Sequence, residues 1–378
     1  MTRQLFADHF EQLLRYWERA RDTDDGGFHC WIRPDGSVRQ FSYRPLVIQA
    51  RILYNYAEGL RFGHEFCAAP ARDVYAFITT RMRTSHGWYT SLRHGELYGA
   101  DALETYRNLF VVIGMARYAQ ATGDASVLAE AERLLELIEE KTVTGDLATE
   151  GILGMSGNTG HWRSSTGMHS GDVALHYLEA LACLRDAGSR IDCRARAAQL
   201  RQFFNAKILD RDLMVIYGWF NGSFDEPYNS PGAYTSLGHA LEWIDFFRCF
   251  DGLELDEDVE RGLLQKSIDY GINAEGHYEN NFFLVEQRTG GVGEFWPHVE
   301  AVKTFNVAYG AYGAPYDRYF RLLAQYYFDH YVDLDGGVFS EIDRNGVVVD
   351  RDKGGVWKCD YHNVRMCVDV MTREKGVL

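Results

Sequence analysis

"DGGFHCWIRPDGSV", residues 25–38, carries a pattern that returns at two other places in the chain, as "SHGWYTSLRHGEL" at residues 85–97 and "DGGVFSEIDRNGVV" at residues 335–348. Each stretch has a glycine, an aromatic residue, a few alternating residues and then a turn glycine. This order predicts a small β-hairpin. Because helical segments flank each stretch, the hairpins mark a repeating unit of the fold.

The segments around the hairpins have apolar residues spaced with the period of an α-helix, and strand-like alternation is confined to short pieces. Counted along the chain, this periodicity predicts about twelve helices. They lie at roughly residues 4–20, 43–60, 66–82, 101–122, 125–140, 170–187, 191–206, 236–250, 257–272, 296–313, 315–331 and 361–373.

The connections between these helices alternate between long and short. Those after the second, fourth, sixth, eighth and tenth helices have about one to six residues, whereas those before each even-numbered helix have just under 20 to about 30. A unit of helix, long loop, helix and short turn, about 60 residues long and repeated six times, cannot bury its apolar face alone. Closing the units into a ring does bury it. We therefore expect an all-α fold, an (α/α)6 barrel in a single domain of residues 1–378, with short β-hairpins in the loops at one mouth.

This arrangement predicts where functional residues lie. Every long loop leads into the N-terminus of an even-numbered, inner helix, so the loops and these N-termini gather at one mouth of the barrel. The short turns seal the other mouth. An open helical repeat protein with a concave surface is the alternative, but it does not require the long loops to fall on one side.

The composition limits the partners of the chain. Its 378 residues are 46% apolar, include only 7 prolines and carry a formal charge of -15. We expect no nucleic acid and no anionic membrane as a partner, because the 39 Lys and Arg residues form no block that would neutralise phosphates. No apolar run approaches the roughly 20 residues that span a bilayer, and the N-terminus has no signal-peptide core. We expect a cytoplasmic protein with a neutral or weakly charged substrate.

The 7 cysteines are an odd number scattered through the chain, which favours reduced thiols over disulfides. Cys359, His362 and Cys367 form a C-x2-H-x4-C string, but metal sites are normally built from two such pairs and there is no second CxxC or HxxxH. We expect no metal. The P-loop, Rossmann, HExxH and G-x-S-x-G motifs are also missing, so the sequence gives no support for a cofactor.

Three histidines, His176, His239 and His362, fall within about two turns of the N-termini of inner helices. A histidine has a pKa near 6.5 and can act as acid and base at neutral pH. A lone helix histidine is more often a core or surface residue, but three at matching heights favour one shared site. Glu242 follows His239 by three residues, so we expect its carboxylate to orient the ring, with a surface contact as the alternative.

Arg51 has apolar neighbours on an inner helix, and a buried arginine must be paired or face a polar ligand. We expect it to face the cavity, with a carboxylate pair as the alternative. Aromatic residues make up 14% of the chain. Rings that stack on the C–H faces of a sugar are typical of a neutral polyol site, although tryptophans also fill space in large barrels. The tryptophans in long loops or at inner-helix starts are Trp88, Trp162, Trp219, Trp296 and Trp357.

Several stretches resemble the N-acylglucosamine 2-epimerase superfamily, which includes cellobiose 2-epimerases, mannose isomerases and mannose 2-epimerases. The similarity runs in register from the first helix to the last, although the middle loops are not specific and residues 154–171 have no recognised counterpart. It implies an (α/α)6 barrel that acts without a redox cofactor at C2 of a small-molecule sugar of the mannose, glucose or fructose type, or a related one. The product would be the 2-epimer or the ketose. The stretches are "RYWERARDTDDGGFHCWIRPDGSV", "LHYLEAL", "GHALEW", "EFWPHVEAV" and "DKGGVWKCDYHNVRMC".

The resemblance also implies roles for residues. His239 and His362 would exchange the C2 proton through an enediolate, and His176 would assist ring opening or hold the intermediate. Arg51 would stabilise the enediolate oxygen, and Glu242 would support His239. Asp172 stands where epimerases of the family commonly have Asn, which we expect to change the hydroxyl contacts and the local pKa. The residues expected to contact the sugar are Tyr106, Asp172, Trp296, Glu300 and Trp357.

Two other functions are compatible with such a barrel. A glycoside hydrolase would need two carboxylates that flank the glycosidic bond, for which Asp101, Glu104, Asp172 and Glu300 are candidates, but the three histidines would have no role. A non-catalytic sugar-binding barrel would keep the aromatic residues without needing His239 or His362. The sequence does not fix the oligomeric state, and a homodimer is compatible with it.

Overall fold

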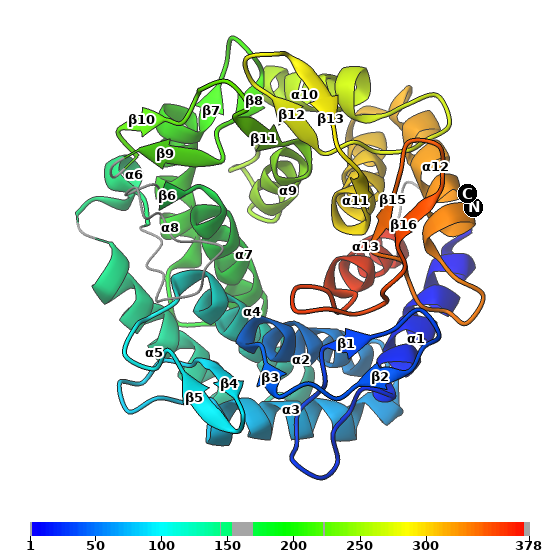
Figure 1. The fold of residues 1–378 in the computed structure, drawn as a ribbon. Coiled ribbons are helices and arrows are strands. Elements are labelled where there is room, and N and C mark those ends of the chain that lie inside the picture. The colour runs from blue at the N-terminus through cyan, green and yellow to red at the C-terminus, as the bar shows by residue number, and fades with distance from the viewer. Residues whose placement is uncertain (1, 144, 153–168, 222–223, 374–378) are drawn as a thin grey trace.

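The computed structural model describes residues 2–143, 145–152, 169–221 and 224–373, and these form a closed ring of helices (Figure 1). Consecutive inner helices pack against each other, and the last of them returns to pack on the first. The predicted (α/α)6 barrel is therefore confirmed. The inner helices are α2 (Leu46–Arg61), α4 (Thr105–Thr122), α7 (Asp172–Asp186), α9 (Leu237–Arg248), α11 (Phe295–Tyr312) and α13 (Tyr361–Thr372).

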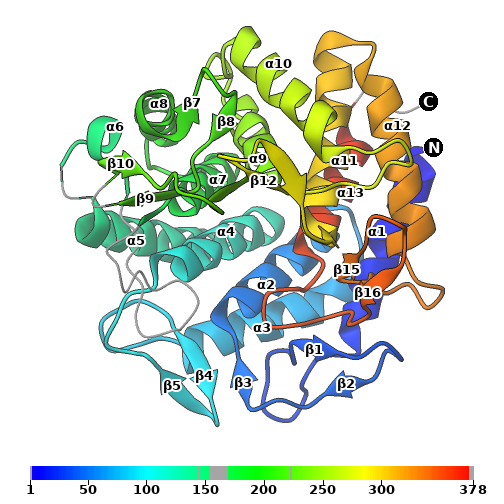
Figure 2. The same ribbon diagram turned by 45° about the horizontal axis from the view of Figure 1, so that its top comes forward.

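Outer helices cover the inner ring (Figure 2). They expose one face to solvent, whereas the inner helices are buried nearly all round: in α2 every residue from Leu46 to Gly59 is buried. The first outer helix packs on the last inner helix, so the two ends of the chain close the ring. The outer helices are α1 (Arg3–Glu18), α3 (Ala68–Arg81), α5 (Ala125–Thr142), α8 (Cys193–Phe203), α10 (Glu257–Lys266) and α12 (Tyr316–Tyr326).

Helix boundaries differ from the prediction in a few places. The second helix begins at Leu46 rather than near residue 43, because Pro45 disfavours helical backbone in the residue before it, and Arg44 belongs to a strand. Three outer helices end in a π-helical turn, at Phe204–Ile208, Ser267–Gly271 and Tyr327–Tyr331. One short helix, α6 (Leu147–Glu150), was not predicted.

All three predicted hairpins are present at the mouth. The sequence missed other strands there, because they are two or three residues long and too short for alternation to be recognised. The hairpins are β1 (Trp31–Ile32) with β2 (Val38–Arg39), β4 (Ser91–Arg93) with β5 (Glu96–Tyr98), β7 (Leu209–Asp210) with β8 (Val215–Ile216), β9 (Trp219–Asn221) with β10 (Glu226–Pro227), β12 (Asn281–Phe283) with β13 (Arg288–Gly290), and β15 (Glu341–Ile342) with β16 (Val348–Asp350).

Strands from successive loops are joined at this mouth. In four places the strand that leads into an inner helix pairs with a hairpin of the following loop. Each such sheet therefore ties two neighbouring loops together by main-chain hydrogen bonds. The joining strands are β3 (Tyr43–Arg44) on β4, β6 (His169–Ser170) on β9, β11 (Tyr234–Ser236) on β12, and β14 (Gly293–Glu294) on β15.

Among the described residues, no helix is both long and apolar enough to cross a membrane. All seven cysteines have free thiols, as their odd number predicted. The unmatched stretch at residues 154–171 lies almost entirely outside the described residues, and so does Trp162.

Candidate active site

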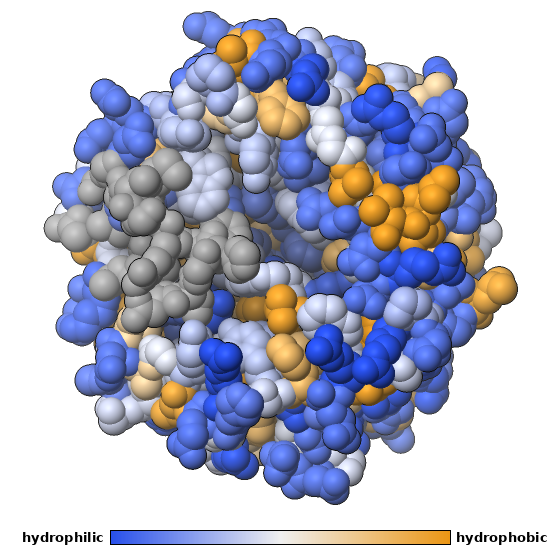
Figure 3. Space-filling model, in the orientation of Figure 1, coloured by the Kyte–Doolittle hydropathy of each residue, from blue (hydrophilic) through white to orange (hydrophobic). Residues whose placement is uncertain are grey.

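A cavity of about 580 Å³ opens at the mouth where the inner helices begin, and Figure 3 shows the hollow at the centre of this face. Its size is typical of small-molecule sites. Each of the six inner helices contributes at least one residue to the cavity wall. Of the residues predicted for the site, Glu300 lies behind His362, and the others line the cavity: Arg51, Tyr106, Asp172, His176, His239, Glu242, Trp296, Trp357 and His362.

In each of the three cavity histidines, the Nδ1 atom lies within hydrogen-bonding distance of a carboxylate. The pKa of each of these carboxylates lies below its usual value. An ionised carboxylate only accepts hydrogen bonds, so Nδ1 must be the donor in every pair. This fixes the ring and leaves Nε2 for the cavity. The Nδ1 distances are 2.9 Å from His176 to Glu179, 3.1 Å from His239 to Asp172 and 2.7 Å from His362 to Glu300.

His239 is positioned by the start of α9. Ser236 is the N-cap of this helix, and its hydroxyl accepts a hydrogen bond from the backbone N–H of His239 at 3.0 Å. Burial alone would lower the pKa of His239, but the charge and hydrogen bond of Asp172 outweigh burial and raise the pKa to about 9. At neutral pH this ring is therefore an imidazolium, ready to donate a proton.

Glu242 does not hold His239, contrary to the expectation from their spacing of three residues. Its Oε1 atom accepts a hydrogen bond from Nη1 of Arg365 at 2.9 Å and lies 4.0 Å from Nδ1 of His362. Asp172, which reaches across from α7, takes the place beside His239 that was expected for Glu242. Glu242 contributes to the raised pKa of His239 only through its charge.

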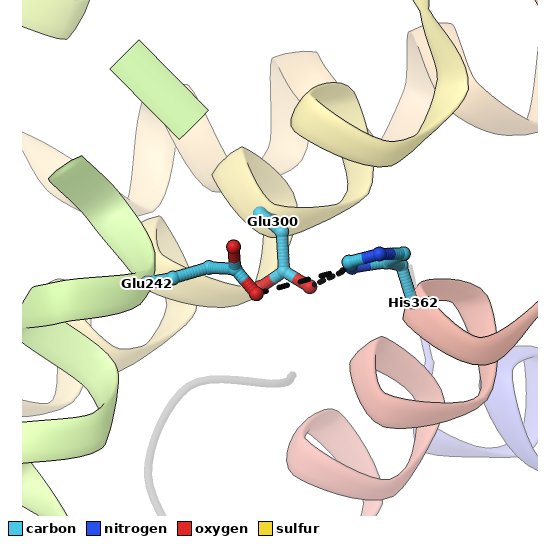
Figure 4. A group of neighbouring side chains, drawn as sticks. All are labelled: Glu242, Glu300 and His362. Carbon is cyan, nitrogen blue, oxygen red and sulfur yellow. Dashed lines mark hydrogen bonds and ion pairs between the residues drawn. The ribbon is translucent and has the colours of Figure 1, made fainter. Parts of the chain in front are cut away.

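His362 has the opposite electrostatic environment. Burial lowers its pKa below 6.5, although the hydrogen bond to Glu300 opposes this change. Figure 4 shows the ring of His362 on α13 pointing at Glu300 on α11. Glu242 of α9 lies on the opposite side of Glu300 from His362. At neutral pH this imidazole is uncharged, and its Nε2 lone pair is available as a base.

Arg51 lies at the cavity wall rather than in a carboxylate pair. Nη1 donates to the carbonyl of Trp357 at 3.0 Å and Nη2 to the hydroxyl of Tyr106 at 3.3 Å. No carboxylate lies within ion-pair distance of Arg51 in the described part of the chain. Its guanidinium, whose Nε has no hydrogen-bond partner there, keeps a positive charge for a ligand oxygen.

Aromatic rings form walls between the histidines. The ring of Trp296 is tilted against two of these histidines, with ring centroids 4.8 Å from His239 and 5.6 Å from His362. Tyr106 contacts His176 edge-on at 5.0 Å and Trp357 at 6.3 Å. Of the other tryptophans, Trp219 lines the cavity, whereas Trp88 donates to the carbonyl of Ala100 in a loop.

The chain that leads into α13 is held from several sides. Arg51 binds the carbonyl of Trp357, Asn55 donates to the carbonyl of Cys359 at 2.9 Å, and the indole N–H of Trp17 donates to Asp360 at 2.8 Å. These contacts fix the start of α13 and hence His362. Burial raises the pKa of the Cys359 thiol to about 12, so it is a buried thiol rather than a thiolate ligand.

Glu242, Glu300 and His362 are close enough to hold one metal ion, since their ligand atoms lie within 4.8 Å of one another. Arg365 contacts both carboxylates, and Nζ of Lys303 lies 2.5 Å from Oε2 of Glu300. These fixed cations already neutralise the carboxylates, and a metal ion would enter beside a guanidinium. We therefore assign the group to an internal ion-pair network.

Sequence reasoning missed Glu179 and Arg365, which both contact site residues. Glu179 follows His176 by three residues, and the spacing argument applied to His239 would have found it. Arg365 follows His362 by three residues, but nothing in its local sequence indicates that three carboxylates from other helices converge on it.

Replacing Asp172 by Asn is expected to shift the alkaline limb of the pH–activity profile. Loss of the carboxylate removes the main cause of the raised pKa of His239, so activity should fall through a pKa well below the present value of about 9. The acid limb, which we expect to follow the ionisation of His362, should stay in place. Asn has nearly the same size and shape as Asp, so we expect the variant to fold. The pH dependence of kcat/KM measures both limbs, and an unmoved alkaline limb would contradict the assignment.

Among the described residues, acid and base groups face one aromatic-walled cavity, and the guanidinium beside them has no carboxylate partner. These groups are suited to moving a proton next to a developing oxyanion. This is the chemistry of carbohydrate epimerases and isomerases. The model of the N-acylglucosamine 2-epimerase (GlcNAc 2-epimerase) family matches residues 26–366, and the chain belongs to this family.

Relatives extend over nearly the whole chain. A cellobiose 2-epimerase of Ruminococcus albus is 25% identical, over 98% of this chain and 97% of its own length. A D-mannose isomerase of Marinomonas mediterranea is 20% identical, over 96% and 95%. The solved structure of a cellobiose 2-epimerase from Bacillus thermoamylovorans has the same fold, with a TM-score of 0.85 at 19% identity over 98% of both chains. The protein is thus a sugar 2-epimerase or isomerase.

Glycoside hydrolases share the fold more distantly. A GH76 α-mannanase from Bacteroides thetaiotaomicron aligns with a TM-score of 0.68 at 11% identity, over 97% of this chain and 95% of that one. This likeness concerns the barrel alone.

Proposed function

We propose that the protein interconverts neutral aldoses by proton transfer at C2, with His362 and His239 as the two acid–base groups and an enediolate as intermediate. The observation that carries this proposal is the different environment of the two rings, each of which has its Nδ1 atom on a carboxylate and lines the same cavity. Asp172 raises the pKa of His239 to about 9, whereas burial lowers that of His362 below 6.5. Environments that push two pKa values apart assign one group as acid and the other as base.

The reaction begins with neutral His362, whose Nε2 removes the C2 proton of the open-chain sugar. Negative charge develops on the enediolate oxygen, and the guanidinium of Arg51 stabilises it. The imidazolium of His239 then returns a proton to the other face of C2, which gives the epimer. If the proton is returned to C1 instead, and the O2 proton moves to O1, C2 becomes the carbonyl carbon and the product is the ketose. Both outcomes use the same three groups.

Ring opening and binding fall to the remaining residues. His176, with Nδ1 held by Glu179, has Nε2 free to move a proton between the ring oxygen and the anomeric hydroxyl. Trp296 and Trp357 offer flat faces for the sugar C–H groups. Asp172 is occupied by His239, so its role is to set the charge of that ring as much as to bind a hydroxyl.

The mouth of the cavity favours an uncharged substrate. Glu294 and Glu341 are cross-strand partners of β14 and β15, and both line the cavity. Their carboxylates disfavour a phosphate group at this edge of the cavity. The names of the relatives, cellobiose 2-epimerase and D-mannose isomerase, suggest the first sugars to test.

A hydrolytic function has less support. Of the four carboxylates nominated for it, only Asp172 lines the cavity. Glu104 lies 2.6 Å from Nη1 of Arg107, and Glu300 is fully buried behind His362. The nominated groups therefore do not form a pair across a bound glycosidic oxygen.

Incubation in D2O with mannose, glucose, N-acetylmannosamine and cellobiose, followed by NMR, tests the proposal. We expect deuterium at C2 of at least one of these sugars, together with its epimer or ketose, and no exchange with mannose 6-phosphate. No exchange with any neutral sugar would contradict the proposal, and release of reducing sugar from an oligosaccharide would favour a hydrolase.

A further inference from the structure

One buried arginine below the cavity is not used by the mechanism. Arg365 lies one turn beyond His362 on α13 and is 7% exposed. Its Nε lies 3.4 Å from Oε1 of Glu179, and its Nη1 lies 2.9 Å from Oε1 of Glu242 and 3.3 Å from Oε1 of Glu300. These carboxylates belong to α7, α9 and α11, so Arg365 joins four of the six inner helices at one point.

Two of the three carboxylates are those that hold the catalytic rings. Oε2 of Glu179 accepts from Nδ1 of His176, and Oε1 of Glu300 accepts from Nδ1 of His362. A continuous chain of contacts thus runs from His176 through Glu179, Arg365 and Glu300 to His362. The carboxylate partners of both rings therefore contact the same guanidinium.

The physical need for this guanidinium follows from charge. Carboxylates that are buried around one point repel one another, and burial by itself raises their pKa values. Arg365 reverses this effect: the pKa of Glu179 falls to about 2, and that of Glu300 lies well below its usual value. If one carboxylate were protonated, it could donate to Nδ1, and the histidine could adopt the opposite tautomer.

Other charged groups around these carboxylates cannot replace Arg365. Lys303 contacts Oε2 of Glu300 at 2.5 Å and Asp245 at 3.1 Å, but it has no contact with Glu179 or Glu242. The hydroxyl of Tyr361 donates to Oε1 of Glu179 and carries no charge. Of the described cations, only Arg365 bridges the partners of both histidines.

We propose that Arg365 is a positioning residue that keeps Glu179 and Glu300 ionised and thereby fixes the Nδ1–H tautomers of His176 and His362 together. This inference rests on the proposed function for its effect on turnover. Its effect on the two rings can be observed without any substrate.

The chain offers a matched control in Arg117. This arginine is also buried on an inner helix, α4, and its Nε lies 3.0 Å from the buried Glu58 of α2. Glu58 pairs with Arg61 rather than with a histidine. Both residues lie toward the C-terminal ends of their helices, away from the cavity. Replacing Arg117 removes a buried ion pair but not a histidine partner.

The test compares Arg365→Gln with Arg117→Gln. The readouts are the thermal midpoint, the pH dependence of kcat and KM for C2 exchange, and the imidazole 15N shifts of His176 and His362. We expect Arg365→Gln to lower kcat by about 10- to 100-fold with a smaller change in KM, to add an acid-side ionisation and to mix the tautomers of both rings. Arg117→Gln should lower only the thermal midpoint.

If Arg365→Gln does not fold, Arg365→Lys serves instead, because it keeps the charge but offers one nitrogen in place of the separate Nε and Nη1 contacts to Glu179 and Glu300. It should mix the tautomers to a smaller extent. Wild-type tautomers and pH profile in whichever variant folds would overturn the inference. Failure of the proposed function is separable, because it would show as no C2 exchange in the wild-type protein while the 15N shifts still respond to the change at Arg365.

Discussion

Replacing His362 by Gln is expected to reduce the rate of C2 deuterium exchange by about 100- to 10,000-fold, the usual contribution of a positioned acid–base group. His362 is the neutral ring of the pair, since burial lowers its pKa below 6.5, and Nδ1 is tied to Glu300 at 2.7 Å. Glutamine keeps a polar group of similar size but cannot take up the C2 proton. The measurement is deuterium incorporation by NMR at saturating sugar.

His298→Gln is the matched control for this experiment. His298 is also a fully buried histidine, on the inner helix α11, but its Nε2 bonds to the carbonyl of Leu323 on the outer helix α12, 2.9 Å away. We expect the control to lower stability and to retain exchange. Wild-type exchange in His362→Gln, or an equal loss in both variants, would remove His362 from the mechanism.

The second large effect is expected at Arg51. Replacement by Met should lower kcat by about 100- to 1,000-fold, as loss of one oxyanion-stabilising donor does in other enzymes. Arg51 has no carboxylate partner among the described residues, so its charge is available to the enediolate. Arg51 also holds the carbonyl of Trp357 at 3.0 Å, and KM should rise because the sugar-stacking wall loosens.

Arg51→Lys separates these two effects. Lysine keeps the positive charge but loses the fork that reaches both Trp357 and Tyr106. We expect this variant to recover part of kcat while KM stays raised. Steady-state kinetics on both variants measures the split, and a kcat unchanged in Arg51→Met would exclude Arg51 as the oxyanion-stabilising group.

Much of the fold could be predicted because it depends on two quantities that can be counted in the sequence, the spacing of apolar residues and the lengths of the connections. Helix periodicity and the alternation of long and short connections are properties of the sequence itself, and a closed ring buries the apolar faces of the repeated units. The positions of Arg51 and the three histidines near the N-termini of inner helices predicted that they lie at one mouth of the barrel. The joining of strands between successive loops could not be predicted, because these strands are two or three residues long and pair with residues distant in the chain.

The carboxylate partners of the histidines were predictable only where both residues lie on the same helix. Glu179 holds His176 within one helix, so spacing predicts it, whereas Asp172 and Glu300 reach their histidines from a neighbouring helix. Glu242 shows the limit of spacing: it lies on the expected helix face, but the charge of Arg365 draws its carboxylate away from His239. Contacts between helices determine which partner such a carboxylate binds, and the local sequence pattern does not indicate these contacts.

The strands that join successive loops bear on how this family could change its substrate. A cavity wall formed by one loop is hydrogen-bonded to the next, as β14 is to β15. Grafting a single loop from a relative would place its strands beside loops of this chain with which they did not evolve to form main-chain hydrogen bonds. Neighbouring loops should therefore be inherited and exchanged as pairs, and new specificities in such barrels should arise from coordinated substitutions across adjacent repeats.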